Sequence, residues 1–302
     1  MLSNFLNWFV PWYPSLPMAL FLVLGALLYL RGSLRRRTAA WRQFLFWTGW
    51  ILLWQALQTQ WDYVAEHEFF IHMMQQATLH DLAPLLVMAA WPGPTWRAGL
   101  GVHWRRRWLL PVLGVAPIRW LGAFLLNPWA ATVLFGGLAV FWLIPSVHVG
   151  VMLNTGLYQL MNWTMTLDGL LFWWLVVDPR PSPPAHMRPG LRIFLPVIGM
   201  LPLMLLGAVL ALTSTDWYPI YTLCGRAVVG LSAMSDQHIG GLILWMPASA
   251  VNVLAAMIAL RHWIALSERK ETVRRARERE RENARPRSAP AGARLDLEVR
   301  RG

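Results

Sequence analysis

The sequence predicts an all-α fold, a polytopic bundle of seven transmembrane helices with the N-terminus outside and the C-terminus cytoplasmic. Three observations lead to this prediction. The 302-residue chain is 56% hydrophobic and only 14% charged, with a mean hydropathy of +0.40, and a water-soluble globule could not cover that much apolar surface with so few charges. Seven apolar runs approach the roughly 20 residues that a bilayer core requires. Basic and non-basic loops alternate along the chain, as the positive-inside rule demands.

The predicted spans follow one another along the chain. They lie near residues 15–31, 41–60, 69–91, 121–145, 156–177, 193–213 and 239–264. The fourth span contains the Asn127-Pro128 pair and follows Pro111 and Pro117. Because proline interrupts helices, an additional interfacial segment around 108–119 is an alternative in this region.

Arginine-rich loops fix the predicted orientation. The segments RGSLRRRTAAWR, WRAGLGVHWRRRW and DPRPSPPAHMRPGLR follow the first, third and fifth spans, and a basic tail follows the seventh. We therefore expect a transmembrane domain at 1–265 and a cytoplasmic tail at 266–302. In the tail, Glu and Arg spaced for i,i+4 pairs predict a charged helix, followed by a disordered Pro/Gly/Ala-rich end. The first 14 residues lack the positive start of a signal peptide, so the mature chain is expected to begin at Met1.

Several function classes have no support in the sequence. The net charge is +12 and the pI about 11.2, but the arginines lie in short loops and one tail, which indicates topology and no nucleic-acid partner. Cys224 is the single cysteine, so one chain cannot form a disulfide or a thiolate-rich metal site. No phosphate-binding glycine loop, HExxH or GxSxG motif is present, and we expect a protein that is not an enzyme.

Polar residues concentrate in the third predicted span. His72, Gln76 and His80 are spaced i, i+4 and i+8, which places them on one helix face, and Asp81 follows at middle depth. A charged group at mid-bilayer costs about 2.5 to 3.5 kcal/mol on insertion scales. Each such group therefore requires a partner or a function.

The fifth predicted span carries a matching stripe. Tyr158, Met161, Met165 and Asp168 recur at helical spacing, and Asn162 lies beside them. Two polar stripes predict a shared cavity that opens outward and is lined by the third, fifth and seventh helices. Asp81 and Asp168 could equally form structural hydrogen bonds to neighbouring helices.

Candidate metal ligands lie at the expected outer level of this cavity. They are His72, His148, His238, Asp236 and Met73; imidazole and thioether suit copper better than they suit magnesium or calcium. The alternative is that these residues serve hydrogen bonding and packing. Near them, Gly240, Gly241 and Trp245 predict a close helix–helix contact, because small residues let membrane helices approach each other.

Three sequence blocks resemble the CtaG-type cytochrome c oxidase assembly factors, a seven-helix family associated with caa-type oxidases. The blocks are HMMQQATLHDLAPLLV (72–87), WLIPSVHVGVMLNTGLYQLMNWTMTLDGLLFWW (142–174) and MSDQHIGGLILWMP (234–247). The resemblance extends from about residue 15 to 265. It implies a role in oxidase maturation in a bacterial cytoplasmic membrane, with oxidase subunits as partners and with help in delivering copper from the outer face.

The chain departs from the family where paired histidines are expected. Gln76 takes the second position of the first HxxxH pair, Tyr158 and Asn162 replace the second pair, and Leu143 stands before Pro145 where the family usually has histidine. Gln, Tyr and Asn are weak copper ligands. The chain is therefore a divergent member that lacks the paired histidines, and a rearranged copper site and a metal-free membrane chaperone or scaffold are both consistent with it.

Two other function classes remain open from sequence. Asp81 and Asp168 at membrane depth are typical of metal or proton transporters. Two facing histidines would suffice for haem ligation, but His72 and His80 share one helix and the other candidates lie in loops or helix mouths.

Overall fold

The computed structural model describes residues 15–223, 225–228 and 230–284, and these residues form helices and connecting turns without a strand. The expected start of the mature chain, Cys224 and the Pro/Gly/Ala-rich end lie outside the described residues. The chain divides into two compact units, Met1–Leu260 and Arg261–Gly302. The two-domain prediction at 265/266 stays a prediction.

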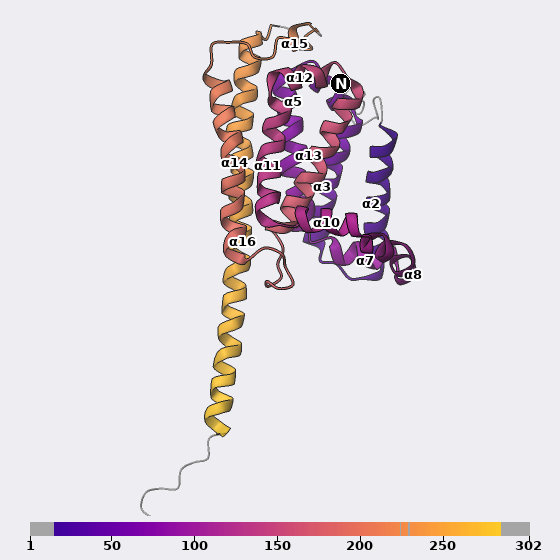
Figure 1. Cartoon of the computed structure of the whole chain (residues 1–302), viewed down its shortest axis with the longest axis vertical. Coiled ribbons are helices and arrows are strands. Elements are labelled where there is room, and N and C mark those ends of the chain that lie inside the picture. The colour runs from indigo at the N-terminus through magenta and orange to yellow at the C-terminus, as the bar shows by residue number, and fades with distance from the viewer. Residues whose placement is uncertain (1–14, 224, 229, 285–302) are drawn as a thin grey trace, which may run out of the picture. The chain divides into compact units, whose positions relative to one another are not determined.

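Long helices run alongside one another in the first unit (Figure 1). They are α2 (Leu16–Arg35), α3 (Ala40–Gln58), α5 (Phe69–Ala77) with its continuation through the π-helical turn η1 (Thr78–Leu82) into α6 (Ala83–Ala89), α11 (Pro128–Leu143), α13 (Thr155–Val176), α14 (Pro189–Leu212) and the first part of α16 (Ala233–Ala284). Shorter elements connect them: α4 (Gln60–Ala65), α7 (Gly93–Leu100), α8 (Val102–Trp104), η2 (Arg105–Leu109), α9 (Leu110–Gly114), α10 (Ala116–Leu125), α12 (Pro145–Met152) and α15 (Ile220–Leu223).

The all-helical prediction is confirmed, and several helices have the length and composition of membrane spans. Among the described residues, α2, α14 and α16 qualify by themselves. Two bent pairs raise the number to as many as five: 102–125, bent by 81°, and 128–152, bent by 72°. This count does not reach the predicted seven. The helices α3 and α13 carry Gln, Asn, Thr and Trp, which lower their mean hydropathy.

The fourth predicted span begins later than the sequence indicated. The Asn127 Oδ1 accepts hydrogen bonds from Trp129 N and Ala130 N at 3.0 and 3.2 Å, and Pro128 occupies the first helical turn. This is an N-terminal helix cap, so α11 starts at Pro128 and residues 121–125 belong to α10. The apolar run was continuous, but its capping residues divide it.

Glycines bring α16 close to its neighbours in the first unit. A Cβ at Gly241 would lie 2.7 Å from the carbonyl oxygen of Gly207 in α14. A Cβ at Gly240 would collide with the ring of Phe69 in α5. Trp245 contributes backbone and Cβ atoms to the same α14 contact, next to Gly207. These three positions therefore lie in helix contacts, where the sequence had placed them.

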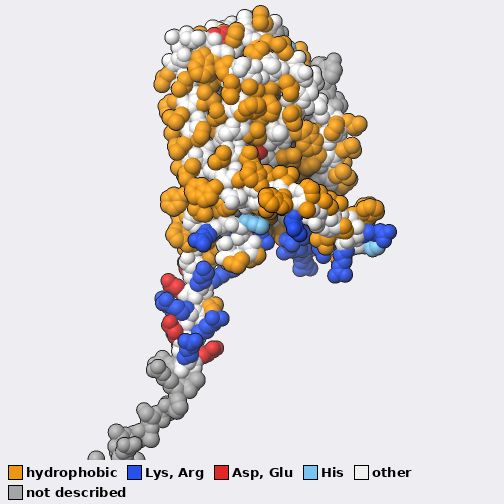
Figure 2. Space-filling model, in the orientation of Figure 1, with side chains coloured by type: hydrophobic (Ala, Val, Ile, Leu, Met, Phe, Trp, Pro, Cys, Tyr) orange, Lys and Arg blue, Asp and Glu red, His pale blue; other side chains and the backbone are white. Residues whose placement is uncertain are grey.

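The surface of the first unit is divided by residue type. Figure 2 shows hydrophobic side chains over its flank and basic side chains, which are arginines in this unit, gathered at one end. In the second unit, α16 continues through the charged segment, with Arg274–Glu278 at 3.4 Å and Arg275–Glu271 at 3.5 Å. Exposed i,i+4 pairs of this kind contribute only about 0.3 to 0.5 kcal/mol each.

Candidate functional site: a buried polar column

Polar side chains of α5, η1 and α13 face each other inside the first unit. Gln76 Nε2 donates to Asn162 Oδ1 at 2.9 Å, which links the two stripes expected from sequence. His72, Gln76, His80, Asp81, Tyr158, Asn162 and Asp168 are all buried. The structure thus turns these groups toward the interior of the bundle and away from its surface.

A small cavity lies at the centre of this column. Its volume is about 20 Å³, which is room for one water-sized occupant. It is lined by His72, Met73, Gln76, His80, Asp81, His148, Met161 and Met165, together with apolar residues. His72 Nδ1 and Gln76 Oε1 have no hydrogen-bond partner among the described residues. Buried polar atoms are rarely left unpaired, so these two atoms are available to a polar group in the cavity.

His148 approaches His72 but is itself held by the protein. The two ring centroids are 5.2 Å apart and the rings are almost perpendicular, at 84°. His148 Nδ1 lies 3.1 Å from the carbonyl oxygen of Trp142, and its Nε2 lies 2.9 Å from the hydroxyl of Tyr221. To bind a metal, His148 would therefore have to give up one of these two contacts.

His80 lies between two carboxylates deeper in the bundle. Its Nε2 is 3.3 Å from Asp168 Oδ2 and its Nδ1 is 3.5 Å from Asp81 Oδ2. Asn252 Nδ2 of α16 donates to Asp81 Oδ1 at 3.1 Å, and the His80 ring stacks on Phe135 with centroids 4.0 Å apart. The third, fifth and seventh predicted helices thus meet at this cluster. Each carboxylate has a partner, as burial requires.

The backbone around His80 is shaped by a proline. Pro84 has no N–H, so it cannot donate the α-helical bond to the carbonyl oxygen of His80. That oxygen instead accepts a hydrogen bond from Trp173 Nε1 at 3.0 Å. A Cβ at Gly169 would collide with the same carbonyl, so this glycine lets α13 approach. Pro84 and Trp173, which lie in the first and second of the three sequence blocks, thus both act on the carbonyl of His80.

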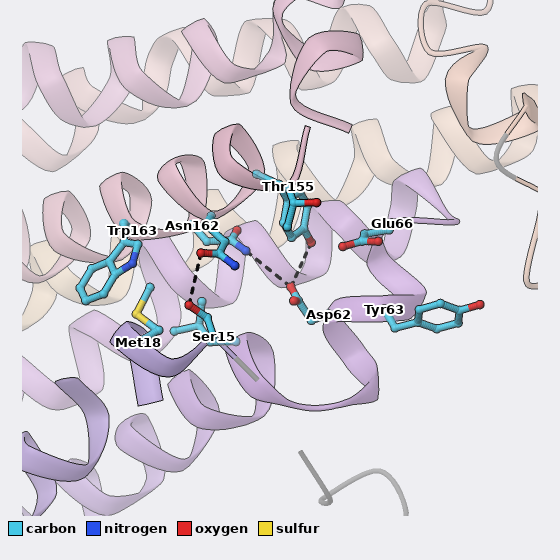
Figure 3. Close-up of a pocket in the computed structure, with 11 residues that line it drawn as sticks. Ser15, Met18, Asp62, Tyr63, Glu66, Thr155, Asn162 and Trp163 are labelled. Carbon is cyan, nitrogen blue, oxygen red and sulfur yellow. Dashed lines mark hydrogen bonds between the residues drawn. The ribbon is translucent and has the colours of Figure 1, made fainter. Parts of the chain in front are cut away.

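A larger pocket opens at the end of the column where α2 and α13 begin. Its volume is about 260 Å³. Figure 3 shows Asp62 of α4 directed toward Asn162, with the ring of Tyr63 pointing away. Asp62 Oδ1 accepts from Gln75 Nε2 at 2.5 Å and from the Tyr158 hydroxyl at 3.0 Å. Burial raises the pKa of Asp62 to about 7, partly offset by these hydrogen bonds.

Asp236 serves as a cap for a neighbouring helix. Its Oδ2 and Oδ1 accept from the backbone N–H groups of Phe69 and Phe70 at 3.0 and 2.8 Å, at the start of α5. Arg226 bridges Asp236 and Glu68, with N···O distances of 2.9 and 3.2 Å. A carboxylate is favourable at a helix N-terminus. Asp236 is therefore occupied by contacts at the helix end and does not line the His72 cavity.

His238 and Gln237 also bind the connection between α14 and α16. His238 Nε2 lies 2.8 Å from the carbonyl oxygen of Thr213. Gln237 accepts from Trp217 N at 2.7 Å and donates to the carbonyl oxygen of Thr215 at 2.9 Å. Of the five candidate metal ligands, the structure therefore brings His72, His148 and Met73 to one cavity and leaves Asp236 and His238 outside it.

Comparison with known families shows which family the chain belongs to. The model of the cytochrome c oxidase caa3 assembly factor family (Caa3_CtaG) matches residues 19–265, most of the chain. The chain belongs to this family. The resemblance found in the three sequence blocks is thereby confirmed. No curated protein and no solved structure matches the chain.

In this Caa3_CtaG member, the side chains at the positions where the resemblance implies paired histidines are held by hydrogen bonds within the column. Gln76 binds Asn162, and the Tyr158 hydroxyl lies 3.1 Å from Gln75 Oε1. Among the described residues, no group of three or more His, Cys, Asp or Glu side chains could hold a metal ion. Any metal in the small cavity would need thioether ligands beside imidazole, and Met73, Met161 and Met165 line that cavity.

Sequence reasoning missed several polar residues that bind the predicted ones. Asp62 and Arg226 lie in segments that were interpreted only as outer loops, and Gln75 and Asn252 lie in predicted spans without being singled out. A signal for Gln75 and Asn252 was present, because uncharged amides in an apolar span need partners as well. Asp62 gave no comparable signal, since acidic residues are ordinary in loops.

Proposed function

We propose that this protein is a non-enzymatic assembly factor of the bacterial cytoplasmic membrane that holds copper and passes it to cytochrome c oxidase from the outer side. Seven spans complete the bundle in this proposal: α2, α3, α5–α6, α11–α12, α13, α14 and the apolar part of α16. With the N-terminus outside, the arginine-rich end of the first unit faces the cytoplasm, as the positive-inside rule favours. The family and the apolar helices support this arrangement.

One observation carries the copper proposal. The Nδ1 of His72 has no hydrogen-bond partner among the described residues, and it lines the cavity that Met73, Met161 and Met165 also line. One imidazole with thioethers is a soft donor set, which suits cuprous copper. The cavity volume of about 20 Å³ would admit one such ion, and His148 is near enough to join as a ligand if its hydroxyl contact with Tyr221 opens.

Copper titration of the purified protein under reducing conditions tests this site. The variants are His72→Ala and the double change Met161→Leu, Met165→Leu, which preserves volume. His238→Ala is the matched control, because that imidazole binds Thr213 outside the cavity. We expect the first two to lose cuprous copper and the control to retain it. Equal copper binding by wild type and His72→Ala would reject the site.

Deletion of the gene tests the assembly role separately. We expect less assembled, copper-loaded oxidase in the deletion strain, restored by the wild-type gene. Normal oxidase content and activity would reject the assembly role. If the amount of assembled oxidase falls but the purified protein binds no copper, the function is that of a metal-free chaperone or scaffold for oxidase subunits.

The His80 cluster favours transport of protons or metal ions as a second candidate. Asp168, His80 and Asp81 form a continuous set of ionisable groups inside the bundle, and such sets often line translocation paths. Proteoliposomes should then show ion flux that Asp81→Asn abolishes. Absence of flux in the wild type would remove this candidate.

A further inference from the structure

A pocket lined by arginines lies between the end of α2, the start of α3 and the turn that leads into α7. Its volume is about 180 Å³. Arg36, Arg37 and Arg42 supply its charge, and Thr38, Trp41 and Trp91 supply much of the remaining wall. None of the residues that line it is acidic. The pocket therefore has the charge of an anion site.

Among the described residues, none of the three guanidinium groups forms an ion pair or donates a side-chain hydrogen bond. Arg42 lies over the ring of Trp41, at 5.1 Å, and interacts electrostatically with Tyr29. Arg180 is different, because it binds Asp178 through Nη2 at 2.7 Å and Nε at 3.0 Å. Three neighbouring like charges repel each other, and an anion between them would relieve that repulsion.

Trp91 connects this pocket to a larger, mostly apolar cavity. That second cavity has a volume of about 500 Å³, and Met88, Trp96, Leu170 and Trp174 are among the residues that line it. Trp91 lines both cavities. Its φ of 55° is unusual for a bulky residue, and a conformation of this kind costs about 1 to 3 kcal/mol. Trp91, whose backbone conformation is strained, thus lies between a basic pocket and an apolar one.

The surroundings match the edge of a bilayer. Trp41 is 56% exposed, and tryptophan is enriched at the level of lipid headgroups. The pocket follows the end of α2, one of the helices long and apolar enough to span a membrane. A basic pocket between spans at this depth is typical of a binding site for anionic lipid headgroups.

We propose that Arg36, Arg37 and Arg42 bind the headgroup phosphate of an anionic phospholipid whose acyl chain passes Trp91 into the apolar cavity. The arginines provide charge and hydrogen-bond donors for phosphate oxygens. The Met88 and Leu170 cavity provides the apolar surface for the chain. This site is independent of the copper proposal, and it shares no lining residue with the His72 cavity.

The test is lipid binding by the purified, delipidated full-length protein in detergent. Phosphatidylglycerol, cardiolipin and phosphatidylcholine are titrated separately and bound lipid is counted by native mass spectrometry. We expect the two anionic lipids to bind and phosphatidylcholine to bind far more weakly. The triple change R36Q/R37Q/R42Q should weaken anionic lipid binding on the order of 100-fold, since each basic group contributes about a factor of five.

A matched control separates the pocket from general basic charge. R105Q/R106Q/R107Q removes the same three charges from η2, whose residues are not buried, and should leave lipid affinity unchanged. Thr38→Glu, which adds a carboxylate to the pocket, should weaken lipid binding even if the triple variant fails to fold. Equal losses in both triple variants, equal binding of phosphatidylcholine, or inorganic phosphate binding as tightly as lipid would each overturn the proposal.

Discussion

Replacement of Asp236 by alanine should destabilise the first unit strongly. The carboxylate is 1% exposed and accepts two backbone hydrogen bonds at the start of α5. Hydrogen bonds to a charged group contribute about 1.5 to 3 kcal/mol each. The change also leaves Arg226 with Glu68 as its single carboxylate partner. We therefore expect a loss of about 3 to 5 kcal/mol in the free energy of unfolding.

The assay is thermal unfolding of the purified protein in detergent, with copper content measured on the same samples. Asp236→Ala should lower the melting temperature on the order of 10 °C. Asp236→Asn, which keeps one acceptor oxygen, should lower it by about half as much. Glu271→Ala is the control, because it removes only an exposed ion pair with Arg275. A melting temperature close to wild type, accompanied by lost copper, would refute the capping role and make Asp236 a metal ligand.

Two further predictions concern the column and the larger pocket that contains Asp62. Burial raises the pKa of Asp62 from 3.8 to about 7. Between these two values the folded protein holds a proton that the unfolded chain releases. The contribution of Asp62 to stability therefore falls as the pH rises from about 4 to 7 and stays constant above pH 7. Asp62→Asn should therefore be more stable than wild type by about 2 to 4 kcal/mol at pH 8, and equal to it near pH 4, in thermal unfolding at each pH; parallel pH profiles would contradict this. Trp173→Phe should lower the free energy of unfolding by about 1 to 3 kcal/mol, because the His80 carbonyl loses the indole donor. Trp120→Phe, at a site that is 77% exposed, is the control and should lower it by less than about 0.5 kcal/mol. Equal effects of the two changes would show that the indole hydrogen bond does not stabilise the fold.

Much of the fold could be predicted because long apolar runs leave few alternatives in a bilayer. The predicted spans at 41–60, 156–177 and 193–213 agree closely with α3, α13 and α14. The region 108–152 was harder, since most of it is apolar while the direction of its helices is set by Pro, Gly and the cap of Asn127. Local hydrogen bonds decide such bends, and hydropathy does not report them.

The candidate site was predictable only along single helices. Helical spacing brought His72, Gln76 and His80 to one buried face, and the structure places them there. Spacing could not show which residue from another helix each would meet. Asn252 reaches Asp81 across 171 residues and Asp236 reaches Phe69 across 167, so these contacts depend on tertiary packing alone.

The residues at the positions where the resemblance implies paired histidines contribute to the packing of the column. Gln76 and Asn162 bind each other and Tyr158 binds Asp62. These hydrogen bonds join α5 to α13 and α4 to α13. The Nδ1 atoms of His72 and His80, which both line the small cavity, have no hydrogen-bond partner among the described residues, and the Nδ1 of His80 lies 3.5 Å from Asp81. A site with one free imidazole and several thioethers favours cuprous over cupric copper, because cupric copper prefers nitrogen and oxygen ligands in planar arrangements. Gln76, Asn162 and Tyr158 therefore join the helices of the column, and under the copper proposal the donors that remain in the cavity would favour the cuprous ion.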